Sequence, residues 1–131
     1  MLIIHGKEAG AQSEQRSATF TGTVWSDPVL RQSDGVTVGE VFFSPGARTY
    51  WHSHERGQVL HVKSGEGWVS TRGSQPDRIR SGDTVWTPPG EQHWHGAADG
   101  HYLLHLAVSL GNTLWDDEVA AEDIAGRANG A

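Results

Sequence analysis

The chain contains no cysteine among its 131 residues. Disulfide bonds and thiolate metal sites are therefore excluded, and any metal ion must be bound through nitrogen and oxygen atoms. No run of apolar residues approaches the ~18 that a bilayer-spanning helix needs. The N-terminal stretch MLIIHGKEAG lacks the apolar centre of a secretory signal. These absences predict a soluble, cytoplasmic protein.

Basic residues are also scarce. Ten lysines and arginines stand against sixteen aspartates and glutamates, which gives a formal net charge of −6. Nucleic acids and anionic membranes favour basic surfaces, so neither is expected as a partner. The expected partner is a small-molecule substrate. The length is enough for one domain with one substantial core and too short for two.

Glycine is plentiful, and it separates short runs of β-forming residues. Seventeen glycines alternate with segments rich in valine, threonine and aromatic residues, which is typical of an all-β sandwich or barrel. We predict a loose arm over residues 1–18, a barrel over 19–110, and a short helix with a tail over 111–131. The predicted strands are 20–25, 36–43, 48–54, 58–63, 67–71, 77–79, 84–87 and 102–108.

Eight histidines are unusual in so short a chain, and four of them form two His-x-His pairs. In the first pair, His52 and His54 are two residues apart on a predicted strand, so their side chains share a face. The turn signal at 55–57 then returns the chain, so that Gln58 lies beside them on the next strand. Three ligand-capable side chains can thus meet at one point inside a barrel.

The second pair lies in the stretch GDTVWTPPGEQHWHGA, residues 82–97. His93 follows a rigid Pro-Pro-Gly loop and could complete the coordination of a metal ion from a partner strand. His95 shares its face, and it is either a general base beside the metal or a hydrogen-bonded core histidine. His105 lies in the apolar run Tyr-Leu-Leu-His-Leu-Ala-Val, where it needs a buried partner. The pocket is the natural place for that partner.

Both stretches resemble the paired motifs of the cupin superfamily. Over residues 46–65 the first has a glycine, five residues, His-x-His, three residues, a glutamine, six residues and a glycine. The resemblance implies a jelly-roll barrel, or double-stranded β-helix, and implies His52, His54, Gln58 and His93 as metal ligands. Cupins usually have glutamate at the position of Gln58. A glutamine is a neutral, weaker ligand, and it could instead be a structural amide.

A closer resemblance is to small bacterial cupins described as manganese-dependent hydroxynitrile lyases. It is carried by the runs FTGTVWSDP, PGARTYWHSH, GEGWV, GDTVW, PPGEQHWHGA and HLAV. It implies Mn(II) as the cofactor, although nitrogen and oxygen ligands also suit Fe(II), Zn(II), Co(II) and Ni(II). It further implies polar pocket residues at Thr49, His95 and His105, our candidates for catalysis. Thr49 fits ordinary strand propensity equally well.

The expected function is a metal-dependent lyase that cleaves a cyanohydrin into a carbonyl compound and cyanide. His95 or His105 would be the general base, and a neutral ligand set would keep the metal ion strongly Lewis-acidic. Two alternatives remain open: a dioxygenase that activates O₂, and a non-catalytic domain that binds a metal and a small ligand. The six tryptophans exceed what one such core needs, which predicts a homodimer or homotetramer.

Overall fold

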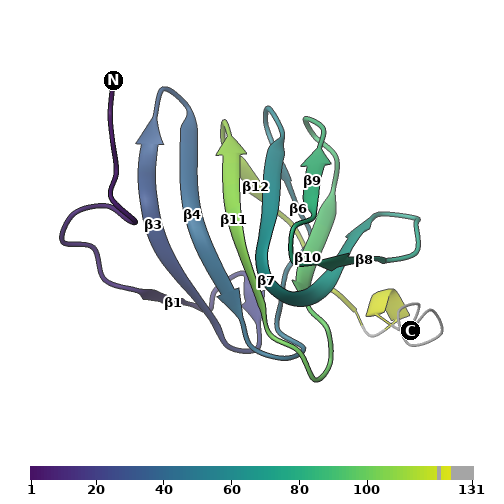
Figure 1. Ribbon diagram of the computed structural model, residues 1–131. Helices are drawn as coiled ribbons and strands as arrows, with labels where there is room; N and C mark the ends of the chain where they lie inside the picture. The colour runs from purple at the N-terminus through teal and green to yellow at the C-terminus, as the bar shows by residue number, and fades with distance from the viewer. Residues whose placement is uncertain (121, 125–131) are drawn as a thin grey trace.

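The computed structural model describes residues 1–120 and 122–124. These residues form twelve strands and almost no helix (Figure 1). The strands are β1 Glu14–Arg16, β2 Phe20–Thr21, β3 Val24–Ser33, β4 Val36–Phe43, β5 Arg48–Thr49, β6 His52–His54, β7 Gln58–Thr71, β8 Asp77–Arg80, β9 Thr84–Thr87, β10 His93–Ala97, β11 Leu103–Leu110 and β12 Thr113–Trp115. Within the described residues, no helix has the length and hydropathy to cross a membrane.

The long strand β7 connects the two sheets of the barrel. Its first half pairs with β11 and β9, and its second half pairs with β10 and β8. One sheet continues from β11 through β4 and β3 to β1, and β11, β4 and β3 stand side by side in Figure 1. The other sheet adds β5 and β2, and β6 and β12, to β10. The predicted all-β jelly-roll barrel is confirmed.

Two segments that we expected as separate strands, 58–63 and 67–71, are the single strand β7. The chain bends between them instead of turning back. Gly65 has φ of +87°, and a Cβ at this position would lie 1.9 Å from the carbonyl oxygen of Tyr102. Only glycine therefore allows β11 to approach β7 so closely at the bend.

The two ends of the chain differ from the expected arm and helix. Residues 14–16 form β1, which pairs with β3 and so is joined to the barrel. Residues 113–115 form β12 on the free edge of β6, because backbone pairing with that edge is available to them. Residues 116–120 have no regular secondary structure and 122–124 are helical, while 121 and 125–131 of the expected helix and tail lie outside the described residues.

The apolar core occupies the inside of the barrel next to the histidines. Phe43 and Leu103 are fully buried in it. Strand β10 is buried on both faces, because Trp94 points outward into a second cluster that contains two further tryptophans. Since side chains alternate along a strand, His93 and His95 point into the barrel. The fold therefore places both histidines of the second pair on the interior face.

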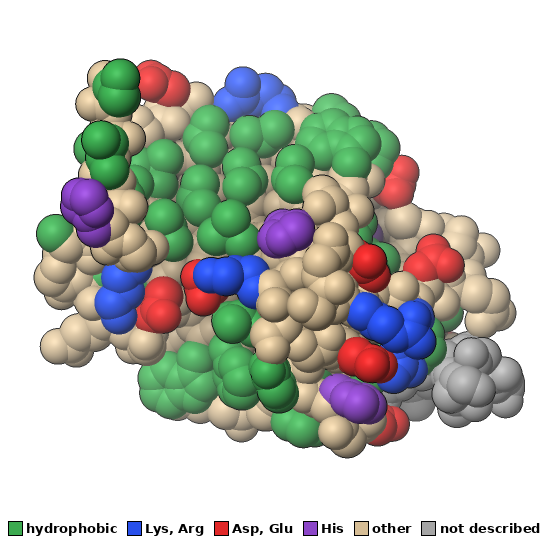
Figure 2. All heavy atoms as spheres, in the orientation of Figure 1, with side chains coloured by type: hydrophobic (Ala, Val, Ile, Leu, Met, Phe, Trp, Pro, Cys, Tyr) green, Lys and Arg blue, Asp and Glu red, His purple; other side chains and the backbone are tan. Residues whose placement is uncertain are grey.

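Hydrophobic side chains gather on the outer face of the sheet that contains β4, β11 and β7 (Figure 2). The register places Val38, Val108, Val59 and Trp86 in one cross-strand row on this face. Trp86 at the end of the row is 54% exposed. An apolar face of this kind supports the expected homo-oligomer, which stays a prediction.

Candidate metal centre

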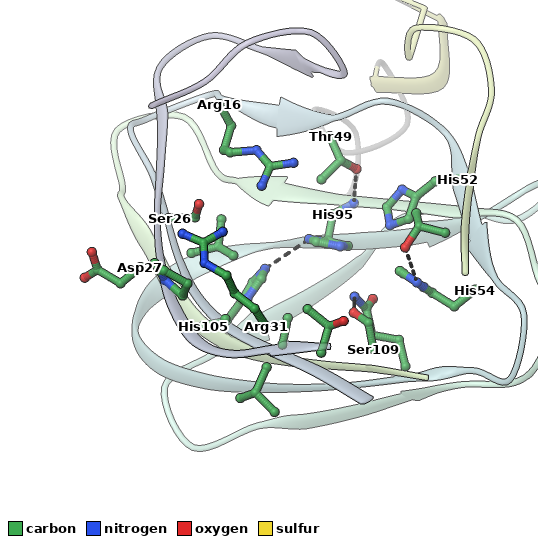
Figure 3. A pocket seen from close by; sticks show the side chains of 18 of the residues that line it. Arg16, Ser26, Asp27, Arg31, Thr49, His52, His54, His95, His105 and Ser109 are labelled. Carbon is green, nitrogen blue, oxygen red and sulfur yellow. Dashed lines mark hydrogen bonds between the residues drawn. The ribbon is translucent and has the colours of Figure 1, made fainter. Parts of the chain in front are cut away.

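A cavity of about 250 Å³ lies inside the barrel and opens to solvent (Figure 3). Six of the seven residues that the sequence predicts for the site line this cavity. These six are Thr49, His52, His54, Gln58, His95 and His105. The seventh, His93, is fully buried behind them, with its ring centroid 4.2 Å from that of His52. None of the seven side chains is more than 4% exposed.

Local structure explains how β6 and β7 bring the predicted ligands together. Strand β6 lies between β10 and β12, and His52 is directly opposite His93. The turn after His54 ends at Gly57, whose φ is +99° and whose Cβ would lie 2.8 Å from the carbonyl oxygen of Thr87. Glycine makes this tight return possible. As a result Gln58 begins β7 beside the two histidines of β6.

Hydrogen bonds on the outer side of the rings set the tautomers of two of the predicted ligand histidines. The Nδ1 atoms of His52 and His93 lie 2.9 and 3.0 Å from backbone carbonyl oxygens two residues earlier. A carbonyl can only accept, so each Nδ1 carries the proton and each Nε2 keeps its lone pair. His54 Nδ1 lies 3.1 Å from the hydroxyl of Thr113. Metal-binding histidines typically have such outer partners.

The inward-facing atoms fit a cation. The Nε2 atoms of His54 and His95 are buried and have no hydrogen-bond partner within the described residues. Gln58 donates its amide N–H to Ser109 at 2.9 Å, which points Oε1 at His93 Nε2, 3.2 Å away. Two acceptor atoms then face each other, which is favourable only if a positive ion lies between them or nearby. The donor set therefore suits a divalent metal.

Burial keeps these histidines neutral. It lowers the pKa of His52 well below 6.5, with the charge of His93 as the second cause. It lowers the pKa of His54 to about 4, and it also lowers that of His93. A metal ion competes with protons for the same lone pairs. At neutral pH all three imidazoles are therefore ready to bind a metal without first losing a proton.

Four inward-facing histidines, His52, His54, His93 and His95, surround one point. The three whose nitrogen atoms lie nearest one another are not the three histidines that the sequence predicts as ligands. The nitrogen atoms of His52, His93 and His95 lie within 4.8 Å of one another. His54 is slightly further out, with its ring centroid 5.0 Å from that of His52 and 5.5 Å from that of His93. His95 is thus as close to the centre as the expected ligands. Ligation by His54 and Gln58 stays a prediction.

His95 and His105 form a buried pair beside this centre. His95 Nδ1 and His105 Nε2 are 3.0 Å apart, joined by one hydrogen bond (Figure 3). The ring of Phe43 packs against both, at centroid distances of 5.8 and 5.2 Å. Burial lowers the pKa of His95 well below 6.5 and that of His105 to about 4. Thr49 Oγ1 accepts a hydrogen bond from the backbone N–H of His95 at 3.3 Å.

Sequence reasoning missed several residues that line the cavity. Ser109 has the same parity as His105 on β11, so the alternation along that strand could have identified it. Thr113 and Trp115 gave no such signal, because their segment was expected to be helical. Arg16 was also missed, because it lies in the segment expected to be a loose arm.

We expect one divalent metal ion per chain, and we expect its loss when His52 is replaced by alanine. The change removes one of few ligands and lets water into the centre. Elemental analysis after growth with Mn, Fe and Zn available measures the ratio of metal to protein. His61→Ala is the control, because His61 is an exposed histidine on the neighbouring strand, bonded to Thr84. An equal metal content in both variants would contradict the assignment.

Comparisons with known proteins agree with this architecture. Residues 39–108 match the model of a cupin domain. The chain is 44% identical over 106 residues to an (R)-mandelonitrile lyase from Granulicella tundricola, a match that covers 78% of this chain and 81% of that protein. A cupin-like protein from Thermotoga maritima has a TM-score of 0.82 and 35% identity, covering 89% of this chain and 94% of the other.

A more distant structure shares the fold alone. The polyketide cyclase RemF from Streptomyces resistomycificus has a TM-score of 0.73 at 17% identity, and the match covers 94% of this chain and 89% of that one. The cupin-domain match spans more than half of the chain, and it contains every histidine of the candidate centre. The chain therefore belongs to the cupin family.

Proposed function

We propose that this cupin is a metal-dependent lyase of hydroxynitrile-lyase type, which cleaves a cyanohydrin into a carbonyl compound and cyanide. The observation that carries the proposal is the buried Nε2 of His95, which has no hydrogen-bond partner among the described residues and lies beside His52 and His93. Similarity to an (R)-mandelonitrile lyase over most of the chain supports this choice of reaction. Mn(II) is the proposed metal, and an aromatic cyanohydrin is the proposed test substrate.

His52, His54, Gln58 and His93 are the residues that would hold the ion. Once bound, a divalent ion supplies a Lewis acid that lowers the pKa of the substrate hydroxyl. All four ligands are neutral, so none of them offsets its charge. Gln58 also donates to Ser109, which keeps its oxygen directed into the site.

His95 is the proposed general base. Its Nε2 accepts the proton of the substrate hydroxyl, the carbon–oxygen bond becomes a carbonyl, and the carbon–carbon bond breaks with its electron pair leaving on cyanide. His95 then returns the proton to cyanide, which leaves as HCN. In this scheme His105 Nε2 accepts the Nδ1–H of His95, which is the tautomer that leaves the His95 Nε2 lone pair in the cavity.

Thr49 has two contributions in this scheme. Its oxygen accepts a hydrogen bond from the backbone of His95 and so fixes the position of that residue on β10. Its own O–H remains available, because an alcohol can accept and donate at the same time. Since Thr49 lines the cavity, this O–H can bind the substrate oxygen or nitrile.

The direct test is cyanide release under strict anaerobiosis. We expect the Mn-loaded protein to release cyanide and benzaldehyde from mandelonitrile without O₂, because proton transfer and bond cleavage need no oxidant. His52→Ala, which loses the metal, should release cyanide only at the rate without enzyme. Absence of cyanide release, together with O₂ uptake on a diketone or a phenol, would reject the lyase and favour a dioxygenase.

A further inference from the structure

The cavity extends from the histidines to a mouth beneath β1 and β3. Arg16, Arg31 and Glu14 line it there, and the two arginine side chains are visible in Figure 3. Strand β1 pairs with β3 so that Arg16 lies opposite Val24 and Glu14 lies opposite Ser26. Directly opposed residues share a face of a sheet. Val24 is buried in the core and Ser26 lines the cavity, so both charged residues of β1 project over the interior face.

The acidic side chains at this mouth already have cationic partners. Glu14 accepts a hydrogen bond from Arg31, and Asp27 lies 3.5 Å from the ammonium group of Lys7. By contrast, no ion pair in the part of the chain that the structure describes includes Arg16. Arg16 therefore has no carboxylate within salt-bridge distance among the described residues, and its charge acts on Glu14 only from further away, so its guanidinium is free to bind an anion at the mouth of the cavity.

An aromatic wall connects Arg16 to the candidate metal centre. The Arg16 guanidinium lies over the ring of Phe20, 5.4 Å from its centroid. The Phe20 ring is 5.6 Å from that of Trp115, which in turn is 4.7 Å from that of His52. All four residues line the same cavity of about 250 Å³. This wall suits a small molecule with a reacting polar end, a flat apolar body and a charged far end.

We propose that the cavity binds a carboxylate-bearing substrate and that Arg16 holds the carboxylate at the mouth. The planar guanidinium can donate two parallel hydrogen bonds to a carboxylate, which fixes the orientation of the substrate as well as its charge. The apolar body then lies against Phe20 and Trp115, with its hydroxyl-bearing carbon at the histidines. This inference rests on the proposed function, which assigns the reaction at the histidines. It adds that the substrate of this site carries a carboxylate.

Binding of two matched alcohols tests the role of Arg16 without any turnover. Isothermal titration calorimetry with the metal-loaded protein compares para-(hydroxymethyl)benzoate with para-(hydroxymethyl)benzamide, which has the same shape and no charge. We expect the carboxylate to bind about tenfold more tightly, as a charge-assisted hydrogen bond allows. Arg16→Gln should remove this difference, and Arg16→Lys should restore part of it.

Arg80→Gln is the matched control. It changes the net charge equally, and Arg80 lies on β8 beside Glu66, outside the residues that line the cavity. This variant should keep the full preference for the carboxylate. No measurable binding of the carboxylate, equal affinities of the two alcohols, or a preference that survives in Arg16→Gln would each overturn the proposal.

The reaction is tested separately with mandelonitrile, which has no carboxylate. If this substrate releases no cyanide while carboxylate binding still depends on Arg16, the lyase assignment fails and the anion subsite stands. If cyanide is released but the carboxylate preference does not depend on Arg16, the lyase stands and the subsite fails.

Discussion

Replacing His95 with alanine is expected to lower kcat for cyanohydrin cleavage by ~10²–10⁴-fold, the usual contribution of a general base. His95 Nε2 is buried, unpartnered within the described residues, and directed at the point that the other histidines surround. Alanine leaves no atom there to accept the hydroxyl proton. Steady-state kinetics of cyanide release, with the metal content measured on the same samples, checks the effect.

Comparing His95→Ala with His105→Gln shows whether His95 acts as a general base or as a metal ligand. His105→Gln keeps a hydrogen-bonding group beside His95 Nδ1, so its rate should fall less than that of His95→Ala. Metal content should stay at the level of the unmodified protein in both variants. If His95→Ala loses its metal, His95 is a ligand, as its distance to His52 and His93 also permits. A kcat within a few-fold of the unmodified protein would show that another group takes the proton.

The free energy of unfolding of the metal-free protein should fall by about 3 kcal/mol between pH 7 and pH 4 from His105 alone. Its pKa is lowered to about 4 in the folded protein because it is fully buried, against ~6.5 in an unfolded chain. The folded state therefore favours the neutral ring. This stabilisation is complete above about pH 6.5 and is lost as the pH falls toward 4.

Urea unfolding at pH 7, 5 and 4 measures this loss. Burial also lowers the pKa of His54 to about 4, so His54 adds a loss in the same direction and over the same pH range. His105→Gln replaces the imidazole with an amide that does not titrate, and its stability should depend less steeply on pH. Parallel pH profiles of the two proteins would show that His105 does not carry the expected effect.

Residues close together in the chain could be assigned from the sequence. His52 and His54 share a face because side chains alternate along any strand, and that rule needs no tertiary contact. The same rule placed His95 on the face of His93, and the apolar run around His105 indicated that it is buried. All of these residues are in fact buried around one cavity. The absence of cysteine, by itself, limits the metal ligands to nitrogen and oxygen atoms.

Strand pairing between distant segments could not be predicted in this way. His93 was expected to reach the metal ion from a partner strand, but neither the bounds nor the neighbours of that strand could be predicted. The pairing of β10 with β7 and β6 satisfies its backbone and makes it a strand. Residues 113–115 are a strand for the same reason: the edge of β6 supplies hydrogen-bond partners that a local pattern cannot reveal.

The shape of the site depends on these long-range pairings. Alternation says that a histidine points inward, but only the register between β6 and β10 decides that His52 lies opposite His93. Likewise, the pairing of β1 with β3 turns Arg16, a residue of an apparently loose arm, into part of the cavity wall. The absence of cysteine decides which atoms can bind a metal, and strand alternation decides which of these side chains share a face. Their convergence follows from the packing of strands far apart in the chain, which local sequence does not encode.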